Sequence, residues 1–174
     1  GRKKENLSFE KFKKIIDELG PEIIHLRLWN WGEPLLNPEI YKMIKYANKF
    51  KIFVNTSTNS FFLTKENVKK IVDSRLDELI VSLDGVSEET YKKYRKAGSF
   101  AKVITAIKTL VQEKQRQKTR LPRIKLQFII MKHNEHEIKK AVELAKGLGI
   151  DELFFKTVGV MDVNVKEDVR LYRI

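Results

Sequence analysis

The residues of this chain that can do chemistry are polar side chains that directly follow short apolar runs. Glu33 lies between a glycine and a proline, just after the apolar run that begins at Leu26. The glycine, Gly32, lets a ligand approach the backbone closely because no Cβ atom stands in the way. A carboxylate here can accept an ammonium group, whereas the plain alternative is a tight turn with a solvated glutamate. This stretch alone leaves both interpretations open.

Polar groups also follow each of the later apolar runs. In chain order they are Thr58 and Asn59, Ser82 with Asp84, His133 and Asn134, and Thr157. If the runs are parallel strands, their carboxyl ends share one edge of the sheet, which is where such folds bind ligands. Arg95, on the helix expected after Asp84, adds a guanidinium group that can bind a carboxylate. Carboxylate, guanidinium, hydroxyl and amide groups together suit a zwitterionic ligand that carries a sugar.

The sequence lacks the motifs of several common classes of enzyme and binding site. Neither G-x-G-x-x-G nor G-x-x-x-x-G-K-[ST] occurs, which argues against dinucleotide and P-loop enzymes. There is no G-x-S-x-G nucleophile elbow. The 174 residues contain no cysteine, so they supply no thiolate to a disulfide, a zinc site or an iron–sulfur cluster. We therefore expect no metal ligands and no catalytic side chain of these types.

Hydrophobic periodicity predicts an alternation of helices and strands. Strands are expected at residues 23–28, 51–55, 78–83, 124–130 and 152–158. Ser8, Thr64 and Ser87 are the expected N-caps of three helices, and Asn37 with Pro38 is expected to start another. A capping box is expected at Asn134 and Glu137, in a helix that ends at a C′ glycine, Gly149.

This alternation predicts an α/β fold with a parallel sheet, either doubly wound or a fragment of a barrel. A length of 174 residues and a hydrophobic content of 42% suit one domain with a sizeable core. We assign residues 1–160 to this domain and residues 161–174 to a C-terminal extension or the start of a next unit.

The formal net charge of +12 is spread mainly over helix faces where lysines alternate with glutamates, as on a solvated surface. The one dense basic block is residues 114–125, where an RNA contact is an alternative.

No apolar run is long enough to span a membrane and no signal-peptide pattern is present, so we expect a cytoplasmic protein with no membrane partner.

The ordered motifs resemble the core of radical S-adenosylmethionine (SAM) enzymes. The resemblance covers residues 8–158 and is carried by Trp31-Gly32-Glu33-Pro34, Ser57-Thr58-Asn59, Val81-Ser82-Leu83-Asp84-Gly85 and Tyr94-Arg95. The nearest branch is that of the molybdenum-cofactor cyclase and the SPASM-type peptide-modifying maturases. This resemblance implies a partial (β/α)6 barrel with a parallel sheet, here about five βα units without the first strand.

The resemblance also implies roles for individual residues. Gly32, Glu33 and Pro34 would form the motif that receives the SAM ammonium group, and Thr58 and Asn59 would face the cofactor. Ser82 and Asp84 would lie near the ribose and the carboxylate of SAM, with Arg95 as a partner for that carboxylate. The segment from Ile129 through Met131 to Asn134 would flank the adenine.

The family reaction is reductive cleavage of SAM at a four-iron–four-sulfur cluster, which gives methionine and a 5′-deoxyadenosyl radical that abstracts hydrogen from a substrate. The C-x3-C-x2-C loop that holds this cluster is absent here, and Trp31 and Ser60 stand where the family commonly has glycine. We expect a truncated piece of a longer enzyme, because loss of a barrel unit exposes an apolar sheet edge that natural proteins avoid. The alternative is a cluster-free, non-catalytic relative that binds SAM, a nucleotide-like ligand or RNA.

On the first interpretation the chain alone cleaves no SAM, since the thiolate ligands are missing. The full-length form would need an electron donor. Its substrate, which could be a small molecule, a peptide or RNA, is not specified by this sequence.

Overall fold

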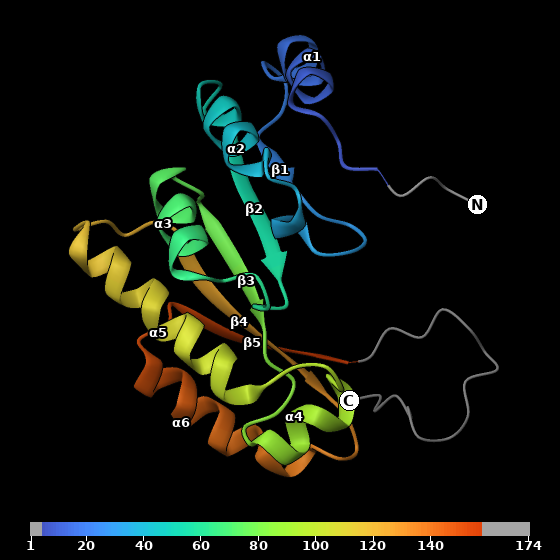
Figure 1. Cartoon of the computed structure of the whole chain (residues 1–174), viewed down its shortest axis with the longest axis vertical. Helices are drawn as coiled ribbons and strands as arrows, with labels where there is room; N and C mark the ends of the chain where they lie inside the picture. The colour runs from blue at the N-terminus through green and yellow to red at the C-terminus, as the bar shows by residue number, and fades with distance from the viewer. Residues whose placement is uncertain (1–4, 158–174) are drawn as a thin grey trace, which may run out of the picture.

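The structure is a computed structural model that describes residues 5–157 (Figure 1). Its strands are β1 (His25–Arg27), β2 (Phe53–Thr58), β3 (Glu78–Ser82), β4 (Arg123–Ile130) and β5 (Glu152–Thr157). They form one sheet in the order β1-β2-β3-β4-β5, and every neighbouring pair is parallel. Sequential order with parallel pairing is the arrangement of a partial barrel, so the expected fold class is confirmed.

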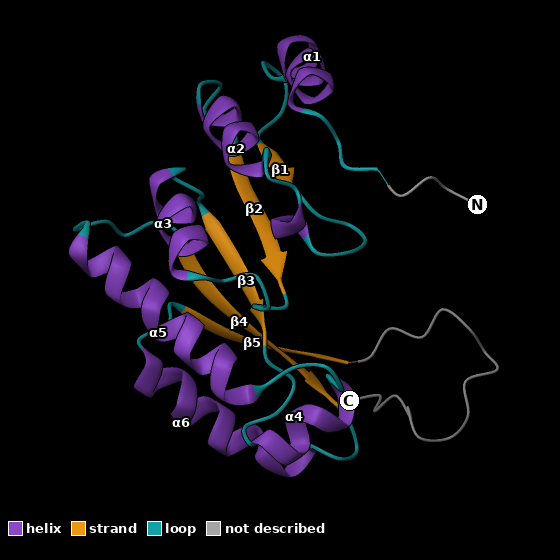
Figure 2. Ribbon diagram, in the orientation of Figure 1, coloured by secondary structure: helices purple, strands orange, loops and turns teal. Residues whose placement is uncertain are grey.

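A helical segment lies between each pair of successive strands. The helices are α1 (Phe9–Leu19), α2 (Ile40–Asn48), α3 (Lys65–Asp73), α4 (Glu88–Tyr94), α5 (Phe100–Arg116) and α6 (Ile138–Leu148), with short 3-10 helices η1 (Pro34–Leu36) and η2 (Glu135–Glu137). Figure 2 shows α2, α3, α5 and α6 along one side of the sheet, while α4 lies near the carboxyl ends of the strands. Among the described residues the opposite side of the sheet carries no α-helix, and η1 lies beside β2.

Alternation along the strands explains why the helices cover this face. Val54, Leu79 and Leu126 are fully buried against the helices, and successive strand residues point to opposite faces of the sheet. The apolar stripe of α1 is only partly buried. Ile15 and Leu19 are each 45% exposed, because α1 packs against α2 with one flank only.

Most of the expected helix ends are confirmed. Ser8, Thr64 and Ser87 are N-caps, and each side chain accepts a hydrogen bond from the backbone N–H three residues further on. Gly149 ends α6 with a φ of +67°, in the left-handed region that favours glycine. These ends could be predicted because a cap depends on a few neighbouring residues.

The expected N-cap at Asn37 is wrong. The chain first forms η1 and α2 begins only at Ile40, with Glu39 as its N-cap residue. Asn37 Oδ1 instead accepts a hydrogen bond from Glu39 N at 3.0 Å, which is an Asx turn. The Glu39 carboxylate reaches Phe9 N in α1 at 2.9 Å and so joins the first two helices.

The second strand begins later than the sequence predicts. It occupies Phe53–Thr58, because the preceding Lys51 has a φ of +59° and belongs to the turn after α2. The strand also continues past its expected end at residue 55, because the hydroxyl-rich segment Thr56 to Thr58 pairs with β3. Threonine is a good strand former, so this extension agrees with local preference.

No helix among the described residues combines the length and the apolar character that crossing a bilayer requires. The expected C-terminal extension at residues 161–174, and Val158 at the end of the last expected strand, lie outside the described residues.

Candidate functional site

Glu33 connects the turn after β1 to the end of β2. Its Oε1 accepts a hydrogen bond from Leu35 N at 3.2 Å, and its Oε2 accepts one from Asn59 N at 2.8 Å. The preceding Gly32 has a φ of +87°, which a residue with a Cβ atom rarely adopts. An ideal Cβ on Gly32 would meet no atom within 4 Å, so the backbone here is open to an approaching group.

The Glu33 carboxylate keeps spare acceptor capacity. Two carboxylate oxygens offer about four acceptor positions, and the two backbone N–H groups use two of them. The side chain is half-buried and lines a hollow of about 590 Å³ together with Trp29, Trp31 and Pro34. This volume falls within the range of about 300–1,000 Å³ that is usual for small-molecule sites.

Thr58 and Asn59 mainly build the turn that follows β2. The Thr58 side chain is 2% exposed, and its hydroxyl accepts a hydrogen bond from Ser60 N at 3.0 Å. Asn59 Oδ1 accepts from Phe61 N at 2.9 Å. Ser60 has a φ of +69°, which explains why glycine suits this position of the family motif. Of the two predicted residues, the half-buried Asn59 is the more accessible one.

Asp84 and Arg95 form an ion pair at the end of β3. The Asp84 side chain is fully buried, and Arg95 Nε donates to its Oδ2 at 2.7 Å. The other oxygen, Oδ1, accepts a hydrogen bond from Ile129 N of β4 at 3.0 Å. Burial raises the pKa of the Asp84 carboxyl group, and the charge of Arg95 opposes that rise. The structure thus places the two predicted residues together, with the arginine bound to the aspartate.

The helix that carries Arg95 approaches this carboxylate closely because of a glycine. An ideal Cβ on Gly85 would lie 2.5 Å from Tyr91 N, so any larger residue would push α4 away. The Ser-Leu-Asp-Gly motif therefore needs its glycine for packing, in addition to the aspartate that it presents.

The expected capping box at Asn134 and Glu137 is wrong. Asn134 makes no side-chain cap hydrogen bond and instead joins two strand ends: its Nδ2 donates to Asp84 O at 3.1 Å and to Ile129 O at 2.9 Å, and its Oδ1 accepts from Met131 N at 2.7 Å. Glu137 reaches Thr90 in α4 and accepts from its hydroxyl at 2.9 Å. Buried polar groups take the partners that the tertiary structure brings near, because leaving them unpaired is costly.

The remaining predicted residues also lie at this edge. Ser82 is 7% exposed and is in register with Gln127 on the sheet face that lacks helices. Met131, directly after β4, is 5% exposed. His133 lies beside them, and burial lowers the pKa of its imidazole, whose Nε2 has no hydrogen-bond partner among the described residues.

Sequence reasoning missed a row of polar side chains that crosses all five strands on the face without helices. His25 Nε2 lies 3.1 Å from Asn55 Oδ1, Asn55 Nδ2 donates to Glu78 Oε1 at 3.2 Å, and Lys125 Nζ lies 3.6 Å from Glu78 Oε2 and 3.0 Å from Glu152 Oε1. The signal was present as single polar residues between buried ones, as at Lys125 between Ile124 and Leu126. Which of these side chains pair depends on the register of neighbouring strands, and this register could not be predicted from the sequence.

Comparison with known proteins assigns the chain to a family. The sequence model of the Radical SAM superfamily matches residues 1–122, which is more than half of the chain. The chain belongs to the radical SAM superfamily. The predicted resemblance is therefore confirmed, and the cofactors of this superfamily are SAM and a four-iron–four-sulfur cluster.

Individual relatives agree with this assignment. The AdoMet-dependent heme synthase of Methanosarcina barkeri is 31% identical over 144 residues, which are 82% of this chain and 39% of that protein. A probable GTP 3′,8-cyclase of Saccharolobus islandicus is 30% identical over 122 residues, which are 70% of this chain and 38% of that protein. The chain thus spans about two fifths of the length of these curated relatives.

The fold agrees with solved radical SAM structures. Streptococcus suis SuiB, in a crystal structure with bound S-adenosylmethionine, superposes with a TM-score of 0.72 at 14% identity. The superposition covers 100% of this chain and 38% of SuiB. At this identity the likeness establishes the partial-barrel fold of this radical SAM chain.

The two cofactors of the family fit these residues differently. The carboxyl edge of the sheet offers a carboxylate with spare acceptor positions and nearby amide, hydroxyl and guanidinium groups, which suit SAM. The cluster needs thiolates, and the 174 residues contain no cysteine. Among the described residues, no group of three or more His, Asp or Glu side chains is placed to hold a metal ion. This radical SAM chain fits SAM and does not by itself fit the cluster.

Proposed function

We propose that this chain is the SAM-binding part of a radical SAM enzyme that generates a 5′-deoxyadenosyl radical for hydrogen abstraction. The observation that carries the proposal is the Glu33 carboxylate, held at the carboxyl edge of the sheet by Leu35 N and Asn59 N with acceptor positions left over. A fixed carboxylate binds an ammonium group well, because no side-chain freedom remains to be lost on binding.

Of the other groups at this edge, some would contact SAM directly and others would hold those groups in position. Glu33 would accept the SAM ammonium group, with Gly32 and Pro34 shaping the turn around it. Ser82 would offer its hydroxyl to the ribose. Arg95 is 27% exposed and binds Asp84 through Nε alone, so its two terminal nitrogens would face the SAM carboxylate. Asp84 would then position the guanidinium group, and its own contact with the ribose would be secondary.

Two further groups complete the proposed SAM site. Asn59 would lie beside the methionine part of SAM, with Thr58 holding its turn. Met131 would lie beside the adenine, in a segment that Asn134 fixes. When bound, the cluster supplies the electron that cleaves SAM, and its thiolates would come from outside these 174 residues.

The carboxylate of Glu33 can be tested by titrating SAM. We expect Glu33→Gln to weaken SAM binding about 10- to 100-fold, which corresponds to about 1.5–3 kcal/mol for a hydrogen bond to a charged group. Isothermal titration calorimetry of the chain and the variant measures this ratio. Glu22→Gln, an exposed glutamate in the turn before β1, is the matched control and should bind like the parent. Equal affinity of Glu33→Gln and the parent would refute the assigned role.

The missing thiolates give a second expected result. The 174-residue chain, incubated anaerobically with iron, sulfide, a reductant and SAM, should form no 5′-deoxyadenosine above a no-protein control, because it has no cysteine ligand for the cluster. Liquid chromatography with mass detection measures the product. A stoichiometric, redox-active cluster on this chain would contradict the expectation.

The same assay separates an enzyme from a cluster-free relative. Repeating it with any coding sequence found upstream of residue 1 tests whether a three-cysteine loop restores product. Formation of 5′-deoxyadenosine would support the enzyme. SAM binding without product, with no such loop encoded, would support a non-catalytic relative.

A further inference from the structure

A second feature of the molecule lies at the opposite edge of the sheet, where the turns lead from helices into strands. Lys51 before β2, Arg75 before β3 and Lys118 before β4 have φ angles of +59°, +58° and +53°. The corresponding turn before β5 has a glycine, Gly149, with a φ of +67°. Glycine is the residue that such left-handed positions favour, yet three neighbouring turns each carry a cation there.

These cations and Arg120 line three adjoining hollows, and we refer to Lys51, Arg75, Lys118 and Arg120 as the basic face. Arg75 lines two of the three hollows, Lys118 and Arg120 line two, and Leu121 lines all three. All four cations are exposed, and none forms an ion pair with a carboxylate in the part of the chain that the structure describes. One carboxylate also lines each hollow, namely Asp151, Asp77 and Asp73, so the charge of this surface depends on what those carboxylates bind.

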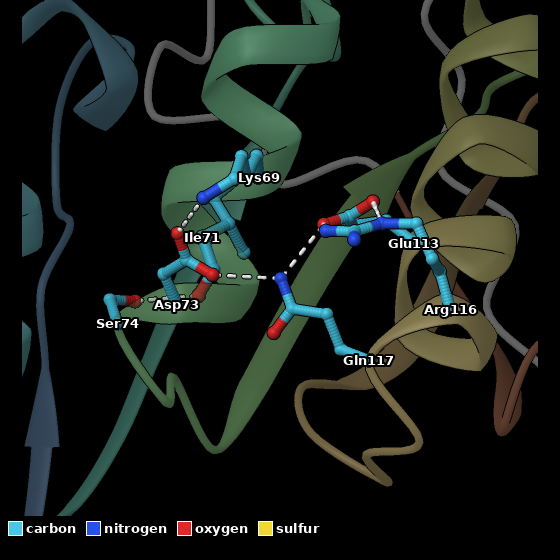
Figure 3. A network of polar contacts seen from close by, with 7 residues as sticks. All are labelled: Lys69, Ile71, Asp73, Ser74, Glu113, Arg116 and Gln117. Carbon is cyan, nitrogen blue, oxygen red and sulfur yellow. Dashed lines mark hydrogen bonds and ion pairs between the residues drawn. The ribbon is translucent and has the colours of Figure 1, made fainter.

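The carboxylates near the basic face are already engaged elsewhere. Figure 3 shows Asp73 bound by Lys69 Nζ at 2.6 Å and by Gln117 Nε2 at 2.7 Å, with Glu113 bound to Arg116 through both of its oxygens. The Arg116 guanidinium lowers the pKa of Glu113 to about 2, so this carboxylate is ionised at neutral pH and keeps its partner.

The acidic residues beside the strand starts are engaged in the same way. Asp77 accepts a hydrogen bond from Val54 N at 2.7 Å, and Asp151 accepts from Ile124 N at 2.7 Å and from Lys114 at 3.0 Å. The nearby negative charges are thus committed to backbone N–H groups and to other cations, which leaves the basic face available to an external anion.

We propose that the basic face binds the phosphate backbone of a nucleic-acid duplex. Its four free cations extend along three successive turns, and a row of separated cations matches a chain of phosphates better than a single small anion. Among the described residues that line the three hollows, Phe53 is the one aromatic side chain. Proteins that bind single strands stack bases on several aromatic rings, so this surface suits a backbone contact with paired strands.

The basic face and the proposed SAM site lie at opposite edges of the sheet. β4 alone has eight residues, and at a rise of about 3.3 Å per residue its first and last residues lie about 23 Å apart. Figure 1 shows the turns before β2, β3 and β4 on the side away from the strand arrowheads. Nucleic acid bound there would tether the protein rather than deliver a base to SAM. The inference is therefore independent of the proposed SAM site.

The proposal can be tested by measuring duplex affinity with fluorescence anisotropy at about 50 mM and about 200 mM salt. The probes are a labelled RNA duplex of about 20 base pairs and a DNA duplex of the same length. The test variant is Arg75→Gln/Lys118→Gln/Arg120→Gln. The control variant, Lys108→Gln/Lys139→Gln/Lys140→Gln, removes the same charge from exposed positions on α5 and α6. Circular dichroism shows whether both variants keep the fold. SAM titration shows whether the proposed SAM site at the opposite edge of the sheet still binds SAM.

We expect the parent to bind a duplex with an affinity that falls steeply with salt. The test variant should bind about 10- to 100-fold more weakly, and its salt slope should be smaller by about one for each phosphate that is no longer neutralised, while the control stays near the parent. Preference for RNA or for DNA identifies the source of the phosphates. The proposal would be overturned if both variants bound the duplex equally weakly or if the parent bound no duplex at the lower salt. It would also be overturned if the parent bound polyglutamate instead of a duplex.

Discussion

Replacing Arg95 with methionine is expected to lower the free energy of unfolding by about 3–5 kcal/mol at neutral to alkaline pH, far more than the removal of a surface cation. Asp84, its partner, is fully buried and 2.7 Å from Arg95 Nε. Removing the guanidinium leaves a buried carboxylate with one hydrogen bond, from Ile129 N. The cost is large because the remaining charge has neither a counter-ion nor water around it.

The destabilisation should depend on pH in a defined direction. Burial raises the folded pKa of Asp84 above its ordinary value of 3.8, so the stability linked to this group is present below that value and lost as pH rises through the folded pKa. Without the opposing charge of Arg95 the folded pKa rises further. The stability deficit of Arg95→Met relative to the parent should therefore be small near pH 4 and grow toward about pH 8.

Urea unfolding followed by circular dichroism at several pH values measures this deficit. The double variant Asp84→Asn/Arg95→Met removes the buried charge and should recover part of the stability at high pH. Arg116→Met is the surface control, because its partner is Glu113 and its side chain is 62% exposed. A deficit that stays below about 1 kcal/mol at all pH values, or one that shrinks as pH rises, would contradict the assigned pairing.

The second large effect is expected at Asn134, where aspartate has nearly the same shape but no amide donors. Asn134 is fully buried, and its Nδ2 donates to the carbonyl oxygens of Asp84 and Ile129. In Asn134→Asp a carboxylate would face these two oxygens, so we expect a decrease of about 3 kcal/mol or more in the free energy of unfolding. Because the side-chain volume is conserved, a cavity does not contribute to this decrease.

The same unfolding experiment measures the effect, with Asn6→Asp as an exposed control that adds the same charge. An unpaired buried carboxyl group has a raised pKa, so the deficit of Asn134→Asp should decrease when the pH is lowered and the group takes up a proton. Parent-like stability at about pH 8 would show that the two strand ends do not depend on this bridge.

Much of the fold could be predicted because its determinants are local. The βα order follows from hydrophobic periodicity, and the caps at Ser8, Thr64 and Ser87 follow from hydroxyl groups that reach an N–H three residues away. Gly149 ends α6 in the left-handed conformation that its lack of a Cβ allows. The polar residues after each strand were also correctly placed at one edge, because parallel strands share a direction.

The errors arose where a polar side chain had both a local and a distant partner available. Asn134 and Glu137 have the spacing of a capping box, yet both side chains bond to segments that lie about fifty residues earlier. Asn37 has the type and position of an N-cap, but η1 intervenes and Glu39 takes that place. A local rule fails in such cases because burial makes distant hydrogen bonds as necessary as near ones.

The sequence by itself therefore determined the order of elements, the carboxyl edge that carries the polar residues and the membership of the radical SAM superfamily. Only the tertiary structure decided which of those residues bind each other. Glu33 is fixed by a backbone N–H 26 residues later, and Asp84 by one 45 residues later. These bonds depend on how neighbouring strands align, and alignment is a property of the packed sheet rather than of any one segment.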